Sequence, residues 1–207
     1  MPSLTVKAAA EMLKLPAFSQ ARILTDQKYP KSGAQAFRTP YYRTALLGIQ
    51  SFFINSNSED EIVIAQNKAA ALSQKTRSEN NLRVLNSFKK SSLHDRMLYY
   101  AKNSKIARSI GNVEFRLSPD FIFEENGKTL LLYLNCRSQP LDTEVARLTI
   151  EIAHWVVEIS GIKIKIDQIE YFDLCNNTSY SFKKRRATTI KNLEENAKVI
   201  DAIWPTL

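Results

Sequence analysis

The chain contains little glycine, cysteine or histidine, and each shortage excludes a class of chemistry. Only five of its 207 residues are glycine, and no glycine-rich loop of the kind that cradles nucleotide phosphates is present. We therefore expect no nucleotide cofactor bound by the common phosphate loops. Two cysteines do not make a disulfide framework. With only two histidines beside them, we expect no structural zinc site either.

The sequence also lacks a long hydrophobic run. No apolar segment approaches the length that spans a bilayer, and the N-terminal residues contain no signal-peptide core. We therefore expect a cytoplasmic protein that makes no membrane contact. A hydrophobic content of 44% and a charged content of 24% are ordinary for a globular chain. The length of 207 residues predicts one compact domain with elaborations, or two small ones.

Positive charge is plentiful and unevenly distributed. The net charge is +8, and residues 1–104 hold 15 Lys and Arg against 7 Asp and Glu. Residues 105–207 hold 14 of each, so the whole excess lies in the first half. Such asymmetry suggests a polyanion such as DNA or RNA, or an acidic protein surface, as a partner. A basic surface that is merely solvated would have the same composition.

The clearest structural signal lies between residues 110 and 137. Asn126-Gly127 separates two β-rich runs and is typical of a two-residue hairpin turn, because both turn positions need positive φ. Side chains alternate between the two faces of a strand. One face of the second strand begins apolar and ends in Asn135 and Arg137, so we expect it to open onto a cleft. The other face is apolar and must be buried, and it carries Leu130, Leu132, Leu134 and Cys136.

An amphipathic helix and another strand follow this hairpin. Asp142 gives a start signal and Gly161 a stop signal for a helix over about 142–160. Residues 162–174 then alternate as one strand, or as two short strands with a bulge between them. Two strands joined through a helix are normally parallel. The sequence therefore predicts a mixed sheet over about 112–174, with mostly helices in residues 1–104.

This order of elements resembles the PD-(D/E)XK nuclease superfamily over roughly residues 80–175. Ser118-Pro119-Asp120 precedes one strand, and Asn135-Cys136-Arg137 ends the next. In that family an Asp opens the second strand, and a Glu-x-Lys or Asp-x-Lys lies near the end of the third. The two carboxylates hold a divalent metal, and the lysine orients the attacking water. Pro119-Asp120 matches the first element, whereas Asn135 and Arg137 replace the second acid and the lysine.

The resemblance implies a restriction-endonuclease-like α/β fold, with a mixed β-sheet flanked by helices and a mainly helical N-terminal elaboration. Residues 1–80 would form the helical, basic N-terminal region. Residues 81–207 would form the α/β core with a C-terminal helix. The opening helix of such a core supplies a further acid in some members, and Asp95 is the one candidate for that role here.

The altered motif predicts a catalytically degenerate protein that binds DNA or RNA without cutting it. Phosphodiester hydrolysis assisted by Mg²⁺ needs a metal held by carboxylates. Asp120 is the only carboxylate left in the motif and the only metal ligand in it. Asn135 lacks the charge that offsets stripping water from Mg²⁺, and Arg137 stays protonated and cannot act as a base. We expect no cofactor, and an Asp120–Arg137 ion pair inside one cleft.

Two other functions remain open. A displaced acid would give an active Mg²⁺-dependent nuclease, and Glu144 and Glu151, two turns apart on one helix face, are candidates, as is Glu114. A solvated helix surface is the favoured explanation for Glu144 and Glu151. Alternatively, the basic half docks an acidic protein partner.

Two groups of cations are candidates for binding nucleic acid. Four consecutive cations follow a short edge strand over 179–182, where they meet phosphates or protect the edge from strand addition. A last helix capped by Thr188 or Thr189 follows them. A second group is interleaved with aromatic residues. The candidates are Lys183, Lys184, Arg185 and Arg186 in the first group, and Arg22, Arg38 and Arg43 in the second.

Overall fold

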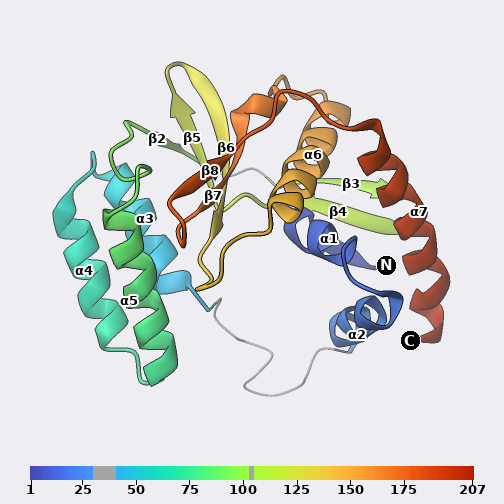
Figure 1. Cartoon of the computed structure of the whole chain (residues 1–207), viewed down its shortest axis with the longest axis horizontal. Coiled ribbons are helices and arrows are strands. Elements are labelled where there is room, and N and C mark those ends of the chain that lie inside the picture. Colours follow the sequence, from blue (N-terminus) through green and yellow to red (C-terminus); the bar gives the residue numbers. More distant parts are fainter. Residues whose placement is uncertain (30–40, 103–104) are drawn as a thin grey trace.

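The computed structural model describes residues 1–29, 41–102 and 105–207, which form an α/β protein with two mixed sheets (Figure 1). The first half is mainly helical, as the sequence predicts. Its elements are β1 (Ser3–Thr5), α1 (Val6–Met12), α2 (Ala17–Lys28), α3 (Arg43–Ile54), α4 (Glu59–Ala70), α5 (Lys75–Lys89) and β2 (Tyr99–Ala101). The boundary expected after residue 80 falls inside α5. No helix in the described ranges is long and apolar enough to cross a membrane.

The second half contains most of the strands and two long helices. Its elements are β3 (Ile106–Ile110), β4 (Val113–Leu117), β5 (Phe121–Glu125), β6 (Lys128–Asn135), α6 (Thr143–Ile159), the 3₁₀ helix η1 (Ile166–Gln168), β7 (Ile169–Asp173), β8 (Thr178–Tyr180), α7 (Ala187–Ile203) and the 3₁₀ helix η2 (Trp204–Thr206). The side chain of Asp142 caps α6 by accepting from the N–H of Glu144, and Gly161 follows the helix with φ +72°. The predicted helix is confirmed.

The larger sheet has five strands in the order β2-β5-β6-β7-β8. β5 and β6 form the predicted antiparallel hairpin, with Asn126 at φ +51° and Gly127 at φ +73° in its turn. β6 and β7 are parallel, because α6 carries the chain back across the sheet between them. β8 pairs antiparallel with β7 and forms one edge, as expected for that segment. The sheet is therefore mixed.

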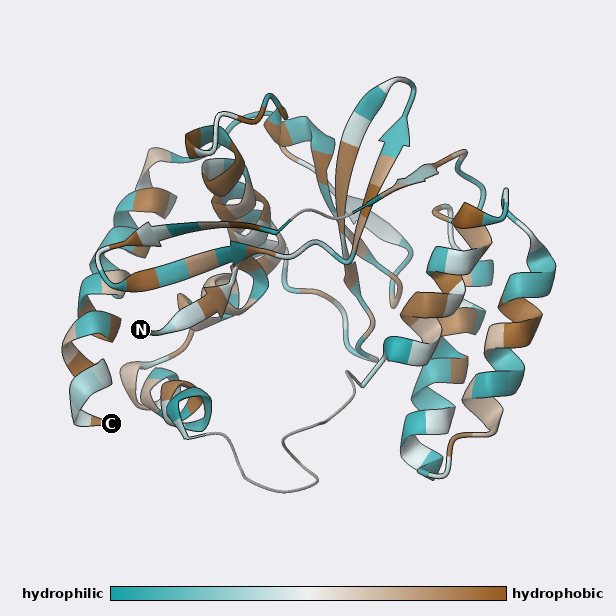
Figure 2. Ribbon diagram, turned by 180° about the vertical axis from the view of Figure 1, so that it is seen from behind, coloured by the Kyte–Doolittle hydropathy of each residue, from teal (hydrophilic) through white to brown (hydrophobic). Residues whose placement is uncertain are grey.

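β6 separates two hydrophobic cores, one on each face of the sheet. Leu131 and Tyr133 belong to the core that includes α1, α6 and α7. The opposite face packs against α3, α4 and α5, and carries Leu130, Leu132, Leu134 and Cys136 as predicted. Figure 2 shows hydrophobic residues concentrated on the inner strands and on the helix surfaces that face them. Successive side chains of β6 therefore point alternately into these two cores, so both faces of the strand are buried.

The prediction of one sheet over residues 112–174 is wrong at its N-terminal end. β4 belongs to a separate three-stranded sheet in the order β1-β4-β3. β1 pairs with it in parallel, with Leu4 opposite Phe115, and β3 pairs with it as an antiparallel hairpin. β4 therefore has strand partners on both sides before the chain passes Pro119 and enters β5.

The strand predicted over residues 162–174 begins late, at Ile169. The segment before it forms η1, in which the Gln168 side chain accepts a hydrogen bond from the N–H of Lys165 at 2.9 Å. Ile166 is buried, and Ile162 and Ile164 pack against the same core without joining a strand. The alternation of isoleucines thus reflects packing of an irregular segment.

Candidate functional site

A pocket of about 310 Å³ lies at the C-terminal end of β6, where the sequence predicts a cleft. We call it the strand-end pocket. It is lined by residues of α1, α3, β6 and β7 and by the segment before β5, among them Lys7, Glu11, Tyr42, Leu46, Asp120, Asn135, Arg137 and Tyr171. Asp120, Asn135 and Arg137 therefore lie around one cavity. Open α/β sheets commonly place ligand sites at the carboxyl ends of parallel strands, and β6 and β7 end here.

Asp120 is held by the backbone of β6 and by a lysine from α1. Its Oδ2 accepts hydrogen bonds from the N–H of Leu134 at 2.7 Å and from Nζ of Lys7 at 3.3 Å. Nζ of Lys7 also donates to the carbonyl of Leu134 at 2.8 Å and lies 5.1 Å from the centre of the Tyr171 ring. Burial is the largest single influence and lowers the pKa of Lys7, but the Asp120 carboxylate, Tyr171 and Cys136 together outweigh it and raise that pKa above its ordinary value.

Arg137 is paired with Glu11, so the expected Asp120–Arg137 ion pair is wrong. Nη2 of Arg137 lies 2.8 Å from Oε1 of Glu11, and the arginine side chain is 66% exposed. Lys7 and Glu11 are four residues apart on α1, and buried neighbours such as Ala10 fix that helix on the core. Asp120 and Arg137 are therefore each paired with an oppositely charged residue of α1, and not with each other.

The amide of Asn135 is committed to the protein. Its Nδ2 donates to the carbonyl of Gln139 at 2.9 Å and to Oδ1 of Asp173 at 2.8 Å. Its Oδ1 accepts from the N–H of Arg137 at 3.1 Å. Asp173 is fully buried and also accepts from the N–H groups of Leu141 and Cys175. Asn135 thus ties together the ends of β6 and β7, a structural role rather than that of a free ligand.

The displaced acids considered from the sequence do not line the strand-end pocket. Glu144 and Glu151 both bind the guanidinium of Arg186. Glu151 is fully buried, so placing it on a solvated surface is wrong. Two further candidates also have protein partners, Glu114 with Ser3 and Asp95 with His94. Across the described residues, no three His, Cys, Asp or Glu side chains gather to hold a metal ion.

The buried carboxylate of Glu151 also accepts hydrogen bonds from residues at the start of the last helix, α7. The hydroxyl of Thr189 donates to Oε2 of Glu151, and the N–H of Arg186 donates to Oε1 at 3.1 Å. α7 begins at Ala187 with Arg186 as the preceding residue, so the expected cap by Thr188 or Thr189 is wrong. Thr189 instead joins α7 to α6 through Glu151.

Two of the four consecutive cations have partners within the protein. Arg185 lies 2.8 Å from Glu158 and contacts His154, and Arg186 holds Glu144 and Glu151. The other two, Lys183 and Lys184, are exposed and form no ion pair within the described ranges. The second group is split as well: Arg22 and Arg43 are exposed on α2 and α3, whereas Arg38 lies outside the described residues.

Sequence reasoning missed Lys7 and Glu11, the residues that complete the strand-end pocket. Their spacing on a capped helix shows that they share a face, but that pattern is common on helix surfaces. Cys136 also lines the pocket, and burial together with the Asp120 carboxylate raises the pKa of its thiol to about 12. The thiol is therefore neutral at ordinary pH and does not act as a nucleophile.

No protein-family model matches this chain, and neither does any curated protein.

Proposed function

We propose that the protein binds DNA or RNA through its phosphates and does not cleave it. The observation that carries the proposal is the ion pairing of both carboxylates in the strand-end pocket, Asp120 with Lys7 and Glu11 with Arg137. Two carboxylates and two cations leave little net negative charge. Little then offsets the cost of dehydrating Mg²⁺, which metal-assisted hydrolysis requires.

The expectation of nucleic-acid binding rests on charge and on the resemblance to PD-(D/E)XK nucleases. The net charge of +8 leaves several exposed cations without acidic partners in the described ranges, including Lys183 and Lys184. Cations that neutralise phosphates release counterions, which drives sequence-independent binding. A restriction-endonuclease-like core and a cytoplasmic location are part of the same proposal.

Binding and cleavage can be measured on the same labelled oligonucleotides, single- and double-stranded, DNA and RNA. We expect affinity that falls steeply with salt, and intact substrate after incubation with Mg²⁺ or Mn²⁺. Asp120→Asn is the control for trace nuclease, because contaminating activity persists in that variant. No salt-dependent binding to any of the four substrates contradicts the proposal and turns attention to an acidic protein partner.

A second candidate is an active nuclease in which Glu11 supplies the missing acid. Glu11 and Asp120 line the same pocket, so a metal that displaced Lys7 and Arg137 would meet two carboxylates. Calorimetry with Mn²⁺ separates the two functions. We expect no binding isotherm for the unmodified protein. Micromolar Mn²⁺ affinity, with cleavage lost in both Glu11→Gln and Asp120→Asn, establishes the nuclease instead.

A further inference from the structure

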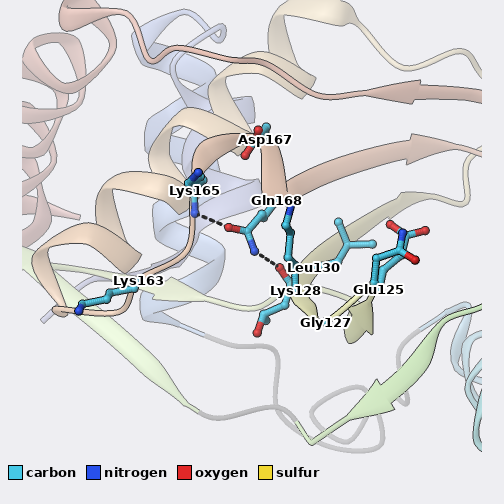
Figure 3. Close-up of a pocket in the computed structure, with 10 residues that line it drawn as sticks. Glu125, Gly127, Lys128, Leu130, Lys163, Lys165, Asp167 and Gln168 are labelled. Carbon is cyan, nitrogen blue, oxygen red and sulfur yellow. Dashed lines mark hydrogen bonds between the residues drawn. The ribbon is translucent and has the colours of Figure 1, made fainter.

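The end of the five-stranded sheet opposite the strand-end pocket carries a second group of cations. A hollow of about 560 Å³ lies there, between the turn of the β5–β6 hairpin and the segment 163–168 (Figure 3). Lys128, Lys163 and Lys165 line it, and all three are exposed. None of them forms an ion pair within the described part of the chain. β6 begins at this hollow and ends at the strand-end pocket, roughly 23 Å away at 3.3 Å per residue.

Little acidic charge opposes these lysines. Two carboxylates, Glu125 and Asp167, also line the hollow. Glu125 is already bound to the guanidinium of Arg96, whose Nη2 lies 2.8 Å from Oε2 of the glutamate. Of the two carboxylates that line the hollow, only Asp167 has no ion pair with a described cation. The lining therefore keeps a net positive charge.

Lys183 and Lys184 lie at the same end of the sheet. β8 runs antiparallel to β7 with Tyr180 opposite Tyr171, so the chain leaves β8 beside the start of β7. η1, which forms a wall of the hollow, directly precedes β7. Figure 1 shows the connection from β8 to α7 crossing the end of the sheet where η1 and the hairpin turn lie. We call this group the lysine end, defined by Lys128, Lys163, Lys165, Lys183 and Lys184.

The hollow offers charged contacts to phosphates but no stacking surface to bases. Gln168 joins its two walls, because its side chain accepts from the N–H of Lys165 and donates to the carbonyl of Thr129 at 2.8 Å. The oxygen and the nitrogen of that amide are therefore both engaged in hydrogen bonds within the protein, so the amide does not recognise a base edge. No aromatic side chain lines the hollow, so bases have nothing to stack on.

The arrangement of the lysines suits several phosphates rather than one. Figure 3 shows Lys163 extending away from Gln168, so the ammonium groups do not converge on a single point. Lys183 and Lys184 extend the positive surface beyond the hollow. Lysine acts as a point charge on phosphate and carries no base specificity.

We propose that the lysine end binds the phosphate backbone of a nucleic-acid duplex, without regard to sequence. This inference rests on the proposed function and assigns its contact surface. The strand-end pocket, where the cations are already paired with carboxylates, lies outside that contact. A duplex is favoured over a single strand because proteins that bind single strands combine charge with aromatic stacking, which the hollow lacks.

The test compares salt titrations of duplex binding by fluorescence anisotropy. The variant Lys128→Gln/Lys163→Gln/Lys165→Gln removes three contacts, so its log–log salt slope is expected to be smaller by about 2.7. Adding Lys183→Gln and Lys184→Gln lowers the slope by about 1.8 more. The matched control is Lys68→Gln/Lys90→Gln/Lys198→Gln, three exposed lysines on or next to α4, α5 and α7 that carry the same change of charge. We expect it to keep the slope of the unmodified protein.

The possible outcomes separate this inference from the function on which it rests. If the unmodified protein binds no nucleic acid, both are overturned. If it binds, and the lysine-end and control variants have equal slopes, only the lysine end is overturned. Tighter binding of single strands than of duplexes, lost in the lysine-end variant, overturns the choice of a duplex. Equal thermal unfolding midpoints for the two triple variants show that neither result comes from misfolding.

Discussion

Glu151 is the residue whose environment departs furthest from its sequence pattern. Its carboxylate is fully buried on α6 and accepts hydrogen bonds from Thr189 and from the N–H and guanidinium of Arg186. Glu151→Ala removes these charge-assisted bonds, so we expect a loss of about 2 kcal/mol in the free energy of unfolding, measured in urea. The comparison is Glu158→Ala, whose ion pair with Arg185 is more exposed; that change is expected to cost less than about 1 kcal/mol.

We expect the two cysteines to differ in reactivity. Cys175 is exposed, whereas Cys136 is buried with a thiol pKa raised to about 12. Because the thiolate is the reactive form, a thiol reagent near neutral pH is expected to modify one cysteine quickly and the other hardly at all. Cys175→Ser should abolish the fast reaction, and urea should restore the slow one. A fast reaction that survives in Cys175→Ser contradicts the buried position of Cys136.

His154 gives the protein a stability that depends on pH. Burial lowers the pKa of His154, Arg185 lowers it further, and Glu158 opposes both. With the folded pKa below the unfolded one, the unfolded state binds more protons between them, so stability falls as pH falls through the unfolded value. Urea midpoints should therefore decrease from about pH 7.5 to about pH 5.5. The decrease should be smaller in His154→Gln, and an equal decrease contradicts the assignment.

Among the helices, the crossing of α3 and α4 depends on one glycine. A Cβ added to Gly48 would lie 2.3 Å from Cβ of Ala65, so the two helices would have to separate. Alanine is favoured over glycine in a helix by about 0.5–1 kcal/mol, but overpacking costs about 1–3 kcal/mol. Gly48→Ala should therefore lower the thermal unfolding midpoint. The double variant Gly48→Ala/Ala65→Gly should recover part of the loss, and no recovery contradicts steric contact as the cause.

Elements with a local signal could be predicted, and elements that depend on distant partners could not. The hairpin around Asn126-Gly127 and the capped helix α6 follow from turn chemistry and periodicity alone. β1 has only three residues and exists because β4 lies beside it. η1 was missed for a similar reason, because its geometry depends on the bond from Gln168 to Thr129 of the neighbouring strand.

At the scale of the whole molecule, dependence on distant partners also explains why Lys7 and Glu11 could not be predicted as part of the candidate site. The cavity and the positions of Asn135 and Arg137 in it follow from the strand pattern, whereas Asp120 is expected there only from the resemblance of its motif. Their partners come from α1, which is placed by the pairing of β1 with β4 and by packing against α6. No local pattern in the sequence indicates which distant helix closes a cavity. The prediction that Asp120 and Arg137 lie at one cavity is therefore confirmed, but the predicted ion pair between them is wrong.

The pairing of β1 with β4 also has a consequence during synthesis. Ser3 lies opposite Glu114, so β1 leaves the ribosome long before its partner strand exists. At about 5–20 residues per second, the intervening chain takes roughly 5–20 s to make. Throughout that time Leu4, which is buried in the finished protein, has no strand to cover it. An emerging chain of this design therefore exposes Leu4 to chaperones, and its smaller sheet can form only after β4 has been translated.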